Sequence, residues 1–231
     1  MPKLKWDEPG TRLYETGTKN GVLYLQDAET GEYNTAVAWN GLTGFSEEPD
    51  GGDANDIYAD DIKYLSLRAT ENFKGTITAY TYPDEFAQCD GSATLLAGVT
   101  IGQQPRKPFG FSYVSTIGND TEFDNHGYKI HLIYGCSVSP SSKDYQTIND
   151  SPEAIEFSWE LDTIPVNVAG HKPTAHVVID STKLTDDGLT AIKNVLYGTD
   201  ASTGAGGATT EGTSGRLPLP DEVVTIIQAA G

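Results

Sequence analysis

Apolar residues recur along the chain mainly in short alternating runs, the pattern that is typical of half-buried β-strands. These runs are rich in Thr, Val, Ile and Tyr and lie between Gly, Pro and Asp residues that break regular structure. Nine strands are expected, over residues 21–25, 35–39, 63–68, 73–82, 109–114, 128–138, 155–162, 174–179 and 222–227. Their short connections predict a mainly β fold of two packed antiparallel sheets, a β-sandwich or barrel, in one domain over residues 1–231.

One segment follows the helical period instead. Leu189, Ile192 and Leu196 recur on one side of a helix, which Thr185 would cap at its start and Gly198 would end. Because the apolar positions lie on one side only, we expect this single helix to lie against a sheet.

Four segments are expected to be extended or irregular. Residues 46–61 hold seven carboxylates and no Lys or Arg around Pro49 and Gly51-Gly52, which predicts a long acidic loop. Residues 198–215 are rich in Gly, Ala, Ser and Thr and are expected to form a flexible loop. An N-terminal arm of about residues 1–20 and a C-terminal strand or arm over residues 216–231 complete the interpretation.

The charge of the chain limits its partners. It carries 15 Lys+Arg against 33 Asp+Glu, a formal net charge of −18, whereas adhesion to nucleic acid needs a basic surface. The balance argues against a nucleic-acid binder, but it suits a surface that nucleic acid must pass without sticking, and also simple solubility. No run of apolar residues is long enough for a membrane helix, and no signal peptide is apparent, so we expect folding in the cytosol.

Motifs that carry catalysis or bind cofactors are not found in the sequence. The nucleophile elbow, the P-loop and the dinucleotide fingerprint are missing, and Gly204–Gly207 resembles a phosphate loop in composition only. Glu156 and Glu160 would stand roughly 13 Å apart along one strand, too far for a glycosidase pair. We therefore expect no enzymatic activity and no cofactor.

Candidate metal ligands are present but lack a recognised spacing. His126, His131, His171 and His176 match no zinc motif and are expected at polar strand or turn positions. The segment with Asp50, Asp53, Asn55 and Asp56 misses the EF-hand pattern, so a solvated acidic segment is favoured over a weak cation site. Cys89 and Cys136 form no C-x-x-C motif and are expected to be small core residues. The expectation is that no metal is bound.

The strand predicted over residues 155–162 has two contrasting faces. One face carries the residues that we expect in the core, Ile155, Phe157, Trp159 and Leu161. The other face is acidic and wet, with Glu156, Ser158, Glu160 and Asp162. Such a face is either an outer surface or the wall of a water-filled channel, and alternation alone is compatible with both.

Six blocks of sequence, in order along nearly the whole chain, carry a resemblance to a known family. They are YADDIKYLSL (58–67), AYTYPDEFAQCDG (79–91), IGQQPRKPFG (101–110), YKIHLIYG (128–135), NDSPEAI (149–155) and LPLPDEV (217–223). In these blocks the chain resembles the major tail tube proteins of long-tailed, non-contractile bacteriophages.

The resemblance implies a structural subunit of the virion, assembled in the host cytoplasm. In this family six subunits close their sheets into a ring-wide β-barrel, and the rings stack into a tube that encloses the tape-measure protein and conducts DNA. Tail-tip and tail-terminator proteins are the further implied partners; DNA would only pass through, and no membrane contact is implied.

The same resemblance, combined with the strand alternation, gives hypotheses for individual residues. The residues expected to face the lumen are Glu156, Glu160 and Asp162. Those expected at contacts between rings or subunits are Glu47, Glu48, Asp50, Asp53 and Asp56. The basic residues available as their counterparts are Lys3, Lys5, Arg12, Arg106 and Lys107.

Two alternatives remain open. A monomeric β-sandwich module binding a carbohydrate or surface ligand could use Trp6, Trp39, Trp159 and several Tyr as an aromatic platform, although alternation places Trp159 on the core face. The second alternative is a subunit of a related tube, from a contractile or secretion machine.

Overall fold

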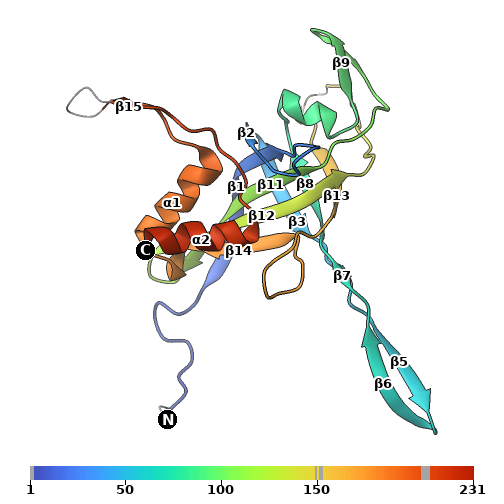
Figure 1. The fold of residues 1–231 in the computed structure, drawn as a ribbon, viewed down its shortest axis with the longest axis vertical. Helices are drawn as coiled ribbons and strands as arrows, with labels where there is room; N and C mark the ends of the chain where they lie inside the picture. The colour runs from blue at the N-terminus through green and yellow to red at the C-terminus, as the bar shows by residue number, and fades with distance from the viewer. Residues whose placement is uncertain (1–2, 149, 151–152, 204–208) are drawn as a thin grey trace.

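An antiparallel sheet of eight strands forms the body of the protein in the computed structural model, which describes residues 3–148, 150, 153–203 and 209–231 (Figure 1). The strands follow the order β2-β1-β11-β12-β13-β8-β3, and β14 pairs with β12. Their bounds are β1 (Tyr14–Leu25), β2 (Thr35–Trp39), β3 (Leu42–Glu47), β8 (Lys74–Ala79), β11 (Phe109–Asn119), β12 (Phe123–Val138), β13 (Phe157–Thr163) and β14 (His176–Asp180). The expected mainly β, antiparallel fold is confirmed.

Four two-stranded ribbons extend from this body. They pair β4 (Asp50–Gly51) with β7 (Glu71–Asn72), β5 (Ala54–Ala59) with β6 (Ile62–Arg68), β9 (Ala93–Leu96) with β10 (Val99–Ile101), and β15 (Ser202–Thr203) with β16 (Thr209–Thr210). The first two ribbons follow one another in a single hairpin over residues 48–72, which we call the arm. Figure 1 shows the arm projecting away from the body, on the side opposite to β9.

The sheet curls around a first hydrophobic core. This core gathers aromatic and aliphatic side chains from distant strands, among them Trp39, Ile77, Phe86, Phe109, Phe111, Ile133 and Trp159. Two short 3-10 helices, Asp84–Gln88 and Ser181–Lys183, complete the chain path, and the first inserts Phe86 into this core. β2 and β3 stand at the two ends of the strand order and are not paired with each other, so the described chain forms one curled sheet. The sequence prediction of two packed sheets therefore stays unconfirmed in detail.

A second core lies between the outer side of the sheet and two helices, α1 (Asp186–Tyr197) and α2 (Pro220–Ala230). Strand alternation separates the two cores: on β12, Ile133 faces the first, whereas Ile130 and Leu132 face the helices. The Tyr24 hydroxyl donates a hydrogen bond to the carbonyl of Leu196 at 3.1 Å, which ties α1 to β1. No helix in the described parts of the chain is long and apolar enough to span a membrane.

The helix predicted from Leu189, Ile192 and Leu196 is confirmed. It is α1, all three residues are buried, and the Thr185 hydroxyl accepts a hydrogen bond from the Gly188 amide at 3.2 Å as the N-cap. Gly198, with φ of 81°, follows its last residue.

The strand predicted over residues 222–227 is wrong, because this segment forms α2 and the fold has two helices where one was expected. Pro220 stands in the first turn, where its missing amide hydrogen costs nothing, and Asp221 and Glu222 follow at the positive end of the helix dipole. Val223 and Ile227 then face the second core one helical turn apart.

The acidic loop predicted over residues 46–61 is also wrong, because most of it forms strands. Asp60 and Asp61 both have positive φ, 51° and 60°, and form the two-residue turn between β5 and β6. The N-terminal arm is shorter than predicted, since β1 already begins at Tyr14. In the expected flexible loop, Thr199 bridges to Thr213 and β15 pairs with β16, while residues 204–208 lie outside the described part of the chain.

Candidate functional site

β13 carries the acidic face that the sequence predicts. Trp159 and Leu161 are buried in the first core. The alternate residues are all exposed, namely Glu156 directly before the strand and Ser158, Glu160 and Asp162 within it. The alternation is confirmed.

The neighbouring strand extends this face. β8 places Thr78 opposite Ser158, Thr76 opposite Glu160 and Lys74 opposite Asp162. The Lys74 ammonium lies 3.6 Å from Asp162 and 3.0 Å from Asp50 of the arm. We call the surface formed by Glu156, Glu160 and Asp162 with these β8 residues the acidic face.

The outer side of the sheet is divided into two halves with different chemistry. Over β1, β11, β12 and β14 this side carries apolar residues such as Leu132, and α1 and α2 cover it (Figure 1). Over β13 and β8 the same side carries carboxylates and threonines, and the described helices leave it uncovered. The division follows from the sequence, because a helix needs apolar side chains beneath it and charged strand positions need water.

The carboxylates predicted at subunit contacts are distributed along the base and first strands of the arm. The Glu48 carboxylate accepts a hydrogen bond from Thr76 at 3.2 Å, whereas Asp53 is exposed. Asp50 pairs with Lys74, and Asp56 pairs with Lys63 at 2.8 Å. The hydrogen bonds from these lysines lower the pKa of Asp50 and of Asp56. Each of these two carboxylates therefore has a lysine of the same chain as its cation.

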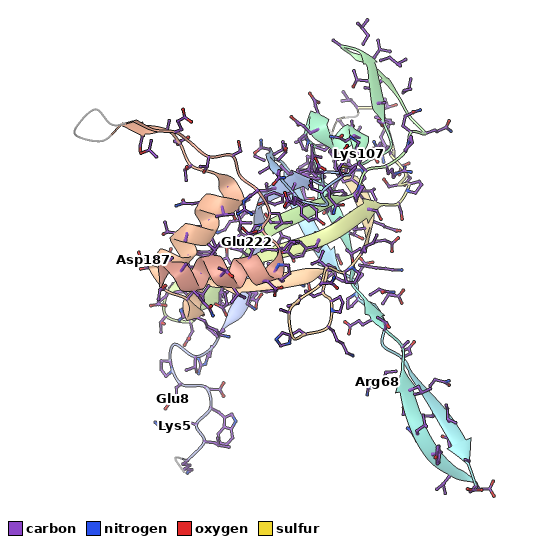
Figure 2. All side chains as sticks on the ribbon, viewed as in Figure 1. Lys5, Glu8, Arg68, Lys107, Asp187 and Glu222 are labelled. Atoms are coloured by element: carbon purple, nitrogen blue, oxygen red, sulfur yellow. The ribbon has the colours of Figure 1, made fainter. Side chains whose placement is uncertain are left out.

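The basic residues proposed as counterparts lie away from these carboxylates. Lys5 pairs with Glu8 at 2.9 Å within the N-terminal segment, and Arg12 donates to the carbonyl of Asp7 at 3.1 Å. Figure 2 places Lys107 on the body, far from Arg68 on the arm. The remaining two candidates, Lys3 and Arg106, are exposed. In the part of the chain that the structure describes, none of the five basic residues forms an ion pair with a carboxylate of the arm.

The arm exposes apolar side chains on both faces. Tyr58 is 67% exposed, Ile62 63% and Tyr64 68%, and every residue of β6 is exposed. Two-stranded ribbons are marginally stable in water unless a hydrophobic face packs against something. The described part of the chain does not bury these side chains.

A cluster of polar side chains lies at the base of the arm, at the inner side of the curled sheet. The Tyr113 hydroxyl donates a hydrogen bond to Glu47 at 2.8 Å, and Tyr113 stacks on His131 with ring centroids 4.4 Å apart. His131 Nδ1 lies 3.2 Å from His176 Nε2, and His131 Nε2 lies 3.0 Å from the Ser115 hydroxyl. The Glu47 carboxylate lies 3.5 Å from His131 and 3.7 Å from His176.

Both histidines of this cluster are poised in the neutral form. Burial, followed by the neighbouring His176, lowers the pKa of His131 to about 4. Burial also lowers the pKa of His176, and the nearby Glu47 charge opposes this effect. At neutral pH each ring therefore carries one N–H and one unprotonated nitrogen, and in the 3.2 Å hydrogen bond between the rings one of the two facing nitrogens donates to the other.

The cluster is the feature that inspection of the sequence missed. His131 and His176 belong to β12 and β14, and His131 stands opposite Val178, so it shares a face with His176 two residues away. Glu47 comes from the end of β3. The three residues match no spacing motif because pairing between strands, and not proximity in sequence, brings them together.

Aromatic and thiol side chains fill the first core. Trp39 is 3% exposed and Trp159 fully buried, so of the three tryptophans only Trp6 is available at the surface. Cys89 and Cys136 are buried free thiols, as expected, and burial raises the pKa of Cys89 to about 12. The aromatic platform of a carbohydrate-binding module is not assembled from these tryptophans.

Comparison with known proteins adds no assignment, because neither the known protein families nor the curated proteins match this sequence. A functional conclusion therefore rests on three features. These are the six sequence blocks between residues 58 and 223 that carry the resemblance, the acidic face and the arm.

Proposed function

We propose that this chain is the tail tube subunit of a long-tailed, non-contractile bacteriophage. Six copies form a ring, and the rings stack into a tube that encloses the tape-measure protein and conducts DNA into the host cell. Tail-tip and tail-terminator proteins bind the ends of the tube, which is assembled in the host cytoplasm and becomes part of the virion. The role is structural and not enzymatic.

The observation that carries this proposal is the divided outer side of the sheet. One half is sealed by two helices, and the other half is bare and acidic. Six copies arranged with the bare half inward would line a lumen with repeated Glu156, Glu160 and Asp162. DNA phosphates are repelled by such a wall, so the DNA slides through without adhering.

The strand edges and the arm support self-association. In the described chain β3 pairs with β8 only, so the other edge of β3 offers unpaired backbone groups to a neighbour. Ring closure would pair such edges in a barrel that spans all six subunits. The arm, with its exposed Tyr58, Ile62 and Tyr64, would pack on an adjacent subunit or ring.

Charge favours the same assignment for the arm. Its base carries the carboxylates Glu48 and Asp53, whereas Lys107 lies elsewhere, on the body. Two copies can bring these opposite charges together, which a single copy does not. The alternative of a monomeric binding module does not account for the exposed arm. Trp39 and Trp159 are buried, so they cannot contribute to a binding surface.

Measuring assembly mass in solution tests the proposal. Ile62→Ser, Tyr64→Ser and Leu67→Ser together remove the three most exposed of the four large apolar side chains of β6 without touching either core. The matched control is Ile164→Ser with Val224→Ser, two exposed apolar residues outside the arm. Light scattering over a concentration series should show oligomers for the wild type and the control and monomers for the arm variant. Equal assembly of the arm variant and the wild type would contradict the role of the arm.

A further inference from the structure

The three side chains at the base of the arm have the composition of a metal site. Glu47, His131 and His176 offer one carboxylate oxygen and two imidazole nitrogens, and these donor atoms all lie within 4.8 Å of one another. Imidazole and carboxylate are ligands of Zn²⁺ in three-residue sites, where a fourth position remains for water. The cluster thus has a suitable donor set.

The donor separations also fit. The three distances are 3.2 Å between the two nitrogens, and 3.5 Å and 3.7 Å from the carboxylate oxygen to each nitrogen. Tetrahedral coordination with bonds of about 2.0–2.1 Å places its donors about 3.3–3.4 Å apart. Shifts of a few tenths of an ångström would therefore bring the three atoms onto one ion.

Neighbouring groups hold each ligand in place. Ser115 lies 3.0 Å from His131 Nε2, so a proton on that nitrogen can be donated to the hydroxyl, which leaves Nδ1 free to bind the ion. The Tyr113 hydroxyl fixes the Glu47 carboxylate, and the Phe73 ring lies 4.6 Å from the ring of His176. Outer partners of this kind orient the ligands in known metal sites.

The surroundings suit a cation. The His131 side chain is 9% exposed and that of His176 17%, whereas Glu47 is 39% exposed and leaves a path from solvent. Glu15 contributes a further negative charge near His131, which the ion-paired Lys129 opposes.

We propose that Glu47, His131 and His176 form a binding site for one divalent transition-metal ion, with Zn²⁺ as the best match. Its ligands come from the end of β3, from β12 and from β14; β14 pairs with β12, whereas β3 pairs with neither of them. A bound ion would therefore fasten the base of the arm to the central strands and set the direction in which the arm leaves the body. This site does not depend on the tube assignment.

Calorimetric titration with Zn²⁺ alone tests the site. The wild type should bind one ion per chain with micromolar affinity or tighter. His176→Asn and Glu47→Gln should each weaken binding roughly 100-fold or more, because each removes a ligand. His171→Asn is the matched control, since His171 is an exposed histidine outside the cluster, and it should bind as the wild type does.

X-ray absorption on the zinc complex of the wild-type chain gives a second measurement that requires no variant to fold. We expect scattering from two imidazoles at about 2.0–2.1 Å. Absence of saturable binding below millimolar Zn²⁺, unchanged affinity in His176→Asn, or a spectrum without imidazole would each overturn the proposal. These zinc measurements test the metal site alone. The tube assignment is tested separately, by the assembly of the arm variant.

Discussion

The indole rings of Trp39 and Trp159 meet edge to face in the first core, with their centroids 5.5 Å apart. Trp39 belongs to β2, at one end of the strand order, whereas Trp159 belongs to β13, four strands further along. Their contact shows how strongly the sheet curls. Because the curled sheet encloses the face of β13 that carries Trp159, the acidic face of β13 points outward.

Truncating this pair should destabilise the subunit. Trp159→Ala should lower the free energy of unfolding by about 3–5 kcal/mol, since it leaves a large cavity. Trp39 Nε1 donates to the Thr81 carbonyl at 2.8 Å, whereas Trp159 Nε1 has no partner among the residues described. Trp39→Phe should therefore cost at least about 1 kcal/mol more than Trp159→Phe, because it abandons a satisfied bond. Urea denaturation measures both, and equal costs would refute the assigned hydrogen bond.

Gly135 marks the place where β12 exchanges partners. The strand β12 pairs with β14 up to Ile133 and with β13 from Cys136 onward. Between these two stretches Gly135 adopts a φ of +60°. A Cβ there would overlap the carbonyl of Ile164. Gly135→Ala should thus cost roughly 2–4 kcal/mol of stability.

Gly98→Ala is the control for that substitution. Gly98 also has positive φ, +86°, but a Cβ added there would meet no other atom within 4 Å, so only backbone strain is added. We expect a cost of about 1 kcal/mol, measured by thermal unfolding. If both substitutions cost the same, close packing against Ile164 is not what requires glycine at 135.

Acidification should weaken the contact between α2 and the segment before it. Arg216 donates to Glu222 at 2.8 Å, and this hydrogen bond lowers the pKa of the Glu222 carboxyl below its ordinary 4.5. The unfolded chain then binds more protons than the folded one, so the stabilisation is complete above pH 4.5 and is lost as pH falls through the lower folded value.

Glu222→Gln measures the size of this effect. The pair is about two-fifths exposed, so solvent screening limits the difference from wild type at neutral pH to about 1 kcal/mol or less. The difference should vanish in acid. A gap that stays constant with pH would show that the substitution acts through packing and not through charge.

Reversing charge on the acidic face should slow DNA passage. Glu156→Lys with Glu160→Lys changes the lumen charge by about four units per subunit, since each substitution alters the charge by two. The control pair Asp200→Lys with Glu211→Lys, which flanks β15 and β16, makes the same change at other exposed positions. Phages carrying either pair should assemble tubes, but only the first should eject DNA more slowly in a dye-release assay. Equal ejection rates would remove Glu156 and Glu160 from the lumen.

Local patterns were sufficient to predict much of this fold. Alternation located β2 over residues 35–39 and the acidic face of β13, and the capping residue Thr185 with the Leu189 stripe located α1. These features depend on neighbours in sequence, which is why they were visible.

The remaining features depend on pairing between distant segments or on competing local signals. The stretch of 222–227 is β-branched, but Pro220 and the acidic first turn start a helix there. The strand expected over residues 63–68 is β6, but the carboxylates of residues 46–61 suggested a loop, so its pairing partner β5 was missed. His131 and His176 became neighbours only through the register of β12 and β14.

Electron microscopy of the purified protein distinguishes a tube subunit from a monomeric module. We expect rings or tubes with a central hole at high concentration, or on addition of tail-tip complexes. A reconstruction of them should place Glu156, Glu160 and Asp162 around that hole. Dispersed single subunits under all of these conditions, or tubes with the acidic face on the outside, would contradict the proposed tube.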